Sequence, residues 1–295
     1  MKKQILWMTL LAAAGTLAAS GETINAAGAT FPAPIYQKWF EEFHKAHGDI
    51  QINYQSIGSG GGIRQLTEGT VDFGASDMPM TDEQLSKVTK FKVLHFPTVL
   101  GGVVPSYNVP GAADLNFSGA TLAGIYLGNI KKWNDPEIKK DNPKANLPND
   151  DITVVHRSDG SGTTFVWTDY LSKVSPEWKS KVGANTSVNW PAGLGGKGNE
   201  GVAGLIKQTP GSIGYVELIY AAQNKMEYGS VKNSAGSFIK ADTSSVSDAA
   251  AGAAKDMPAD FRVSITNAPG KSAYPISSFT WLLIPDKIPD ATKKK

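Results

Sequence analysis

One segment, residues 157–164 (RSDGSGTT), joins an apolar run at residues 152–155 to an amphipathic run at residues 164–171. A strand that turns through glycines into a helix is typical of α/β proteins. It presents unpaired backbone N–H groups at the positive end of the helix dipole. Arg157, Ser161 and Thr163 add side-chain donors, and a guanidinium matches two oxyanion oxygens at once. The segment therefore predicts a binding site for an oxygen-bearing anion.

Periodicity along the chain predicts the same alternation of strands and helices elsewhere, which indicates an α/β fold. Strands are expected at residues 50–54, 71–75, 93–96, 99–107, 152–155, 212–216 and 278–284, and helices near 34–46, 61–68, 162–173 and 200–209. In the first helix, Ile35, Trp39, Phe40 and Phe43 share one face, which we expect to pack on a sheet as core. About 275 mature residues favour two domains.

The first twenty residues have the pattern of a secretory signal peptide. Lys2 and Lys3 precede an apolar run at residues 5–14, and small residues 18–20 form a cleavage region. The apolar run is too short to span a bilayer. The chain contains no cysteine, which excludes disulfides and a lipid-modified cysteine at the cleavage site. We expect a periplasmic protein that is not lipid-anchored.

The charge of the chain gives no general case for binding nucleic acid or membranes. The formal net charge is +2, and removal of Lys2 and Lys3 leaves about zero. We therefore expect no nucleic-acid partner.

Three earlier segments share the strand–turn–helix design. Residues 28–32 (GATFP) carry Thr30 and Phe31, residues 58–62 (GSGGG) carry Ser59, and residues 72–77 (DFGASD) end in Asp77. An ordinary helix cap and a structural glycine turn remain alternatives for the first two, and the second lacks the Lys-Ser/Thr ending of a P-loop. A carboxylate at an anion site is reasonable if the anion carries a proton.

The combination of these motifs resembles the periplasmic phosphate-binding protein of the phosphate-specific ABC transporter. AGATFPAP, IGSGGG, DFGASD and RSDGSGTTF occur in that family's order, with LGNIKKWNDPEI, WPAGLGGKGNEGVAG and PGSIGYVE as further matches. The resemblance implies a two-lobed, type II-like periplasmic binding protein fold, with a hinge of two crossing strands and the ligand in the cleft. Residues 21–103 and 275–295 would form lobe 1, without the family's C-terminal helices, and residues 104–274 lobe 2.

The resemblance also implies the ligand shell. Backbone N–H groups, hydroxyls, one guanidinium and one carboxylate would bind inorganic phosphate: Thr30, Phe31, Ser59, Asp77, Arg157, Ser161, Gly162 and Thr163. Asp159 would hold the guanidinium in place. Asp77 would accept the proton that phosphate carries near neutral pH and sulfate lacks, so we expect it to exclude sulfate.

The implied function is phosphate binding with lobe closure and delivery to a membrane permease and ATPase complex, by a monomer without cofactor, metal or enzymatic activity. A secreted phosphatase or phosphate-transfer enzyme, and an adhesion or matrix protein that keeps the fold, are the alternatives. Ser161 lacks the G-x-S-x-G elbow, and His44 and His47 lack a third metal ligand. The glycine-rich residues 193–198 are predicted to be a structural turn.

Overall fold

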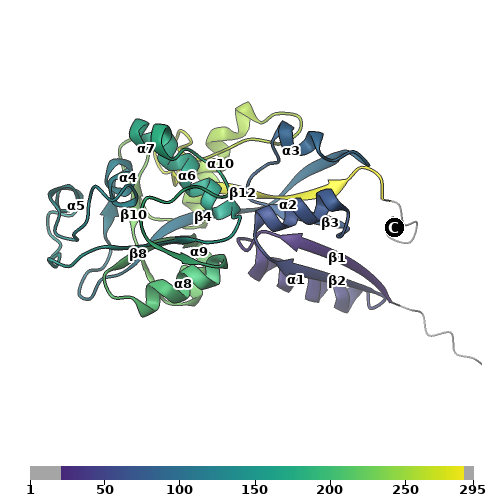
Figure 1. Cartoon of the computed structure of the whole chain (residues 1–295), viewed down its shortest axis with the longest axis horizontal. Coiled ribbons are helices and arrows are strands. Elements are labelled where there is room, and N and C mark those ends of the chain that lie inside the picture. The colour runs from purple at the N-terminus through teal and green to yellow at the C-terminus, as the bar shows by residue number, and fades with distance from the viewer. Residues whose placement is uncertain (1–20, 289–295) are drawn as a thin grey trace, which may run out of the picture.

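The computed structural model describes residues 21–288, so the predicted signal peptide lies outside the described residues, as do residues 289–295. Figure 1 shows two groups of elements, here called the first and second lobes, joined through strand β4. The first lobe contains β1 to β3, α1 to α3 and β12, and the second lobe contains the elements from β5 to α10. The α/β prediction is confirmed.

The elements of the first lobe and the joining strand are β1 (Glu22–Gly28), α1 (Ala33–Ala46), β2 (Ile50–Ser56), α2 (Ser59–Glu68), β3 (Phe73–Ser76), α3 (Asp82–Ser86), β4 (Val93–Asn108) and β12 (Ser277–Pro285). The second lobe has the helices α4 (Gly119–Tyr126), α5 (Pro136–Asp141), α6 (Gly162–Val174), α7 (Pro176–Lys181), α8 (Gly198–Gln208), α9 (Leu218–Gln223) and α10 (Thr243–Ala253). Its strands are β5 (Asn116–Phe117), β6 (Thr153–Arg157), β7 (Leu194–Gly196), β8 (Ser212–Glu217), β9 (Glu227–Tyr228), β10 (Ser230–Lys232) and β11 (Phe238–Ile239).

Strand β4 belongs to both lobes. The main sheet has the order β2-β1-β3-β12-β4-β8-β6-β7, with β9 beside β4. The first part of β4 pairs with β12 up to Gly102, and the rest pairs with β8 from Val103. The returning chain enters β12 at Ser277, opposite Gly102. The chain therefore passes between the lobes twice, within β4 and just ahead of β12, and the two passages are neighbours in the sheet. The predicted boundaries at residues 103 and 275 stay a prediction.

The two lobes have separate cores. Trp281, Leu283 and Leu66 lie in the core of the first lobe. The core of the second lobe is aromatic, and its Trp167 and Tyr215 rings stack with centroids 5.1 Å apart. Each lobe thus buries apolar surface of its own, which supplies most of the free energy of folding.

Several elements differ from the sequence prediction. Two expected strands, at residues 93–96 and 99–107, form the single strand β4, because a register shift between Thr280 and Trp281 accommodates Pro97 in the pair with β12. Strands β1, β5, β7 and β9 to β11 and helices α3, α4, α5, α7, α9 and α10 were not predicted. The glycine-rich residues 193–198, predicted to be a turn, contain strand β7, which pairs with β6. Helix α2 begins two residues earlier than expected, at Ser59.

The predicted core face of α1 is wrong. Ile35, Trp39 and Phe43 are 38 to 45% exposed, whereas Tyr36 is buried and Phe40 is half-buried. Tyr36 packs edge-on against Tyr54 of β2. The helix therefore faces the sheet with Tyr36 and Phe40, each one residue after a residue of the predicted face. The spacing located an apolar face correctly, but two apolar stripes lie side by side on this helix and only tertiary packing selects one.

Glycine at position 62 allows α2 to lie directly on β1. A Cβ there would come 2.5 Å from the Cα of Gly28 and 2.6 Å from the carbonyl oxygen of Ala27. We expect Gly62→Ala to reduce the free energy of unfolding by about 1 to 3 kcal/mol, because the helix must move off the sheet. Gly204→Ala in α8 is the control, since its Cβ meets nothing within 4 Å. It should be neutral or stabilising by up to about 1 kcal/mol. Urea unfolding of both variants measures the difference, and equal effects would contradict the packing argument.

Candidate anion-binding site

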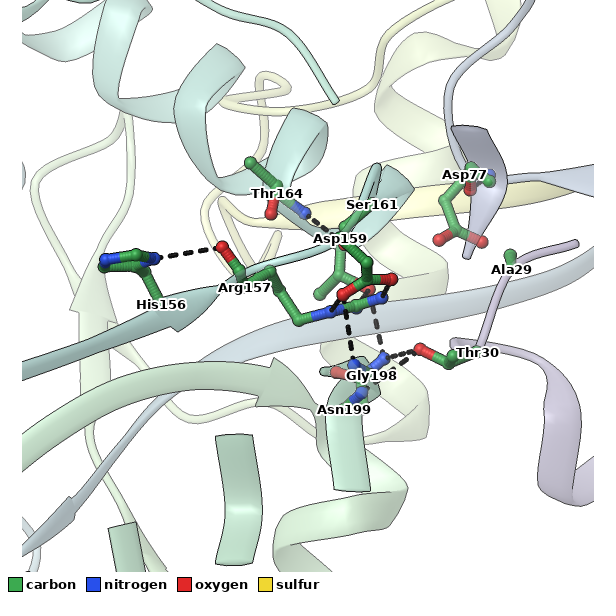
Figure 2. Close-up of polar contacts among 12 residues, drawn as sticks. Ala29, Thr30, Asp77, His156, Arg157, Asp159, Ser161, Thr164, Gly198 and Asn199 are labelled. Carbon is green, nitrogen blue, oxygen red and sulfur yellow. Dashed lines mark hydrogen bonds and ion pairs between the residues drawn. The ribbon is translucent and has the colours of Figure 1, made fainter. Parts of the chain in front are cut away.

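The predicted residues come from turns that follow strands in both lobes. Those from the first lobe lie after β1, at the start of α2 and after β3, and those from the second lie at the end of β6 and the start of α6. Figure 2 shows Thr30 and Asp77 approaching from one side and Arg157 and Ser161 from the other. The predicted side chains are at most 3% exposed, and Gly162 is also buried: Thr30, Phe31, Ser59, Asp77, Arg157, Ser161 and Thr163.

The two lobes touch at this site through glycines. The Gly60 N–H donates to the carbonyl oxygen of Gly160 over 2.9 Å. A Cβ on Gly162 would lie 2.4 Å from Ser59 Oγ and 2.5 Å from Asp77 Oδ2. Glycine is thus required where the N-terminus of α6 meets the first lobe. The structure brings together the residues that the sequence predicted from the two lobes.

The start of α6 supplies donors. The hydroxyl of Ser161, the N-cap residue, accepts a hydrogen bond from the Thr164 N–H over 3.0 Å. The N–H groups of the first helical turn have no acceptor within the helix, and the helix dipole is positive there. Gly162 and Thr163 therefore direct backbone dipoles that favour an anion.

Arg157 is held in one orientation. Its Nε and Nη2 donate to the two carboxylate oxygens of Asp159 over 2.8 and 2.5 Å. The Gly198 N–H also donates to Asp159, over 3.1 Å. Burial alone would raise the pKa of Asp159, but the Arg157 hydrogen bonds and charge hold that pKa below its ordinary value. The pair leaves Nη1 of Arg157 near Thr163 Oγ1, at 3.4 Å.

Asp77 is a buried carboxyl group with one free acceptor. Oδ1 accepts from the Thr280 hydroxyl over 2.6 Å, whereas Oδ2 is buried without a hydrogen-bond partner in the described part of the chain. Burial raises the pKa of Asp77 to about 7, against the lowering effect of the Thr280 hydrogen bond and the Arg157 charge. The carboxyl can therefore take up or share a proton near neutral pH.

Sequence reasoning missed three residues at this site. Asn199 is fully buried and donates to Thr30 Oγ1, Tyr220 donates to the Thr30 carbonyl oxygen, and Thr280 donates to Asp77. Asn199 follows the glycines that were predicted to be a structural turn, and its position at a helix start after a strand matches the other segments. That shared design could have found it. Tyr220 and Thr280 carry no comparable local signal.

The arrangement suits binding of a compact oxyanion. Backbone dipoles, hydroxyls and one guanidinium converge opposite one carboxyl acceptor, in a site shielded from water. Within residues 21–288, no group of three or more His, Cys, Asp or Glu side chains is placed to hold a metal ion. Nor does that part of the chain have a helix with the length and apolar character needed to cross a bilayer.

Comparison with known proteins defines the class first. A family model described as "PBP superfamily domain" matches residues 13–294. Solved structures share the fold at low identity. The phosphate-bound, high affinity periplasmic phosphate-binding protein PfluDING matches with a TM-score of 0.70 at 22% identity, over 92% of this chain and 82% of that one. A phosphate binding protein from Stenotrophomonas maltophilia matches with a TM-score of 0.67 at 21% identity, over 92 and 80%. The predicted two-lobed periplasmic binding protein fold is confirmed.

Relatives at higher identity define the family. The phosphate-binding protein PstS of Pasteurella multocida (strain Pm70) is 48% identical over 286 residues, which cover 96% of this chain and 82% of the relative. PstS of Methanocaldococcus jannaschii is 40% identical over 279 residues, covering 88 and 72%. This chain therefore belongs to the PstS family of phosphate-binding proteins, a family of substrate-binding transport proteins.

The raised pKa of Asp77 predicts a pH-dependent stability. The folded-state pKa of about 7 exceeds the ordinary value of 3.8, so the folded protein holds a proton that the unfolded chain releases in this interval. Stability should fall as pH rises from about 4 to 7, by up to about 4 kcal/mol. Asp77→Asn cannot lose that proton. We expect this variant to unfold at a higher temperature than wild type at about pH 8, in the absence of ligand, and at a similar one near pH 4. A wild-type advantage at about pH 8 would contradict the assignment.

Proposed function

We propose that this protein binds inorganic phosphate in the periplasm and delivers it to an ABC importer. One observation carries the proposal: the partner-free Oδ2 of Asp77 lies beside the N-terminus of α6, where donors from both lobes converge. An anion bound there meets one acceptor among many donors. It must carry a proton of its own or meet a protonated Asp77. The PstS relatives support the same ligand.

The donors have complementary roles in this proposal. The backbone N–H groups of Thr30, Phe31 and Gly162 and the hydroxyls of Ser59, Ser161 and Thr163 donate to phosphate oxygens, and Arg157 supplies the one guanidinium. Asp159 orients that guanidinium through two hydrogen bonds. Asp77 accepts the phosphate proton. Because preorganised dipoles are strong where water is excluded, they can hold a doubly charged anion with a single nearby cation.

Selection against sulfate follows from this single acceptor. Phosphate and sulfate have similar size and tetrahedral shape, but sulfate is unprotonated near neutral pH. Above the Asp77 pKa of about 7, the ionised carboxylate would face a sulfate oxygen with no proton between them, which leaves a buried acceptor unpaired. Sites that depend on such a hydrogen bond can reject the wrong ligand by ~10⁴ to 10⁵.

The proposal extends to the partners and the state of the protein. A monomer, exported by its signal peptide and not lipid-anchored, binds phosphate and passes it to the permease and ATPase complex. We propose no nucleic-acid partner, cofactor or catalytic activity. The capping bond that Ser161 accepts from the Thr164 N–H supports a structural and binding role for this hydroxyl, in place of a nucleophile.

Calorimetric titration tests the ligand and its selection. We expect wild type to bind phosphate and to give no heat with sulfate at roughly thousandfold higher concentration. Asp77→Asn should weaken phosphate binding and bring the sulfate affinity within roughly tenfold of it, because the amide donates to either anion. Asp150→Asn, on an exposed residue ahead of β6, removes the same charge and should leave both affinities unchanged. Undiminished sulfate exclusion in Asp77→Asn would refute the role of Asp77.

Burial of the site predicts lobe movement. Ligand groups at most 3% exposed become accessible to an ion when the lobes separate. Contacts between the lobes, such as Gly60 to Gly160 and Tyr220 to Thr30, would break and re-form. We expect phosphate to decrease the radius of gyration measured by solution scattering, and sulfate at the same concentration to leave it unchanged. A constant radius in a sample that calorimetry shows to be saturated would argue against closure.

A further inference from the structure

Asn199, the second residue of α8, joins hydroxyls from opposite lobes. Its Nδ2 donates to Thr30 Oγ1 over 2.7 Å and to Thr163 Oγ1 over 3.1 Å, and its backbone N–H donates to Thr30 Oγ1 over 3.2 Å. Figure 2 shows the amide directly beside Thr30, below the Arg157 guanidinium. The side chain is fully buried.

The amide can have only one orientation here. The N–H of Glu217 donates to Asn199 Oδ1 over 2.9 Å, so the oxygen faces β8. A flipped amide would place its NH₂ group against the Glu217 N–H, so that two donors would meet with no acceptor between them. The NH₂ group of Asn199 therefore points at the threonine hydroxyls.

These contacts determine what the hydroxyls can still do. A hydroxyl has one proton to donate and two lone pairs that accept. Thr30 Oγ1 accepts two hydrogen bonds, both from Asn199. Thr163 Oγ1 also accepts two, from Asn199 and from Nη1 of Arg157. With both lone pairs occupied, each hydroxyl can act only as a donor.

We propose that Asn199 is a positioning residue for the anion, an inference that rests on the proposed phosphate-binding function. It fixes the hydroxyls of Thr30 and Thr163, one from each lobe, as donors to the ligand. Because it contacts both only when the lobes meet, it links orientation of the donors to closure. Asn199 acts through the threonines and does not itself need to touch the ligand.

The decisive comparison is between two substitutions of Asn199. Asn199→Asp keeps the shape and the acceptor for Glu217, but its second oxygen would take the threonine protons and add a negative charge. We expect a loss of phosphate affinity of at least about 100-fold. Asn199→Ala releases the hydroxyls without reversing them, and should cost roughly tenfold. A residue needed only for packing would tolerate the isosteric aspartate better than alanine, so the opposite order, or unchanged affinity, would overturn the proposal.

A double-mutant cycle tests whether Asn199 acts through Thr30. We expect Asn199→Ala to weaken phosphate binding less in a Thr30→Val background than in wild type, because one of the two hydroxyls that Asn199 orients is gone. Tyr220→Phe is the matched control: it removes another bond between the lobes to Thr30, but to its carbonyl oxygen, so its effect should be additive with Thr30→Val. Additive losses for Asn199 and Thr30 would count against the proposal.

Calorimetry with inorganic phosphate gives the affinities, and thermal melting of each variant shows that it is folded. If wild type gives no heat with phosphate, the proposed function itself fails. If wild type binds and the Asn199 variants bind equally well, only the role of Asn199 fails. If neither Asn199 variant folds, the residue is structural and the proposal is wrong.

Discussion

Everything at the site depends on pairing polar groups that the contact between the lobes removes from water. A buried donor or acceptor without a partner costs about 1 to 3 kcal/mol, so each one constrains its neighbours. Arg157 is paired with Asp159, Asn199 with two threonines, and Asp77 Oδ1 with Thr280. Among the side chains predicted for this site, Asp77 Oδ2 is buried without a hydrogen-bond partner in the described part of the chain. A ligand that carries a proton would supply the hydrogen bond that Asp77 Oδ2 lacks.

The sheet explains how this pairing can be made and broken. Strand β4 runs through both lobes and connects them, while each lobe has its own core. The lobes meet through glycines, through hydrogen bonds such as the one from Gly60 to Gly160, and through Ala29 and Phe31, which pack with the core of the second lobe. An anion that satisfies donors from both lobes adds the free energy that favours closure.

Local sequence predicted those site residues that lie in a turn between a strand and the helix that follows it. Turns that carry Thr30, Ser59 and Ser161 follow strands and open helices, and each brings its donors with it by virtue of chain geometry alone. Residues that depend on distant partners escaped prediction. Thr280 lies 203 positions from Asp77, and Asn199 lies 169 from Thr30, so no local pattern links them. Helix α1 failed for the same reason, since the face that packs is chosen by the sheet beneath it.

By itself, the sequence indicated the α/β fold and the types of group at the candidate anion site, because strand periodicity, glycine turns and helix starts are short-range properties. The order of its motifs indicated the family by resemblance. Tertiary structure decided three things that depend on several elements meeting. These are the raised pKa of Asp77, which comes from burial; the donor-only state of the Thr30 and Thr163 hydroxyls, which comes from Asn199; and the closeness of Gly162 to the first lobe. Desolvation and hydrogen-bond pairing are properties of the assembled site, and a linear pattern cannot contain them.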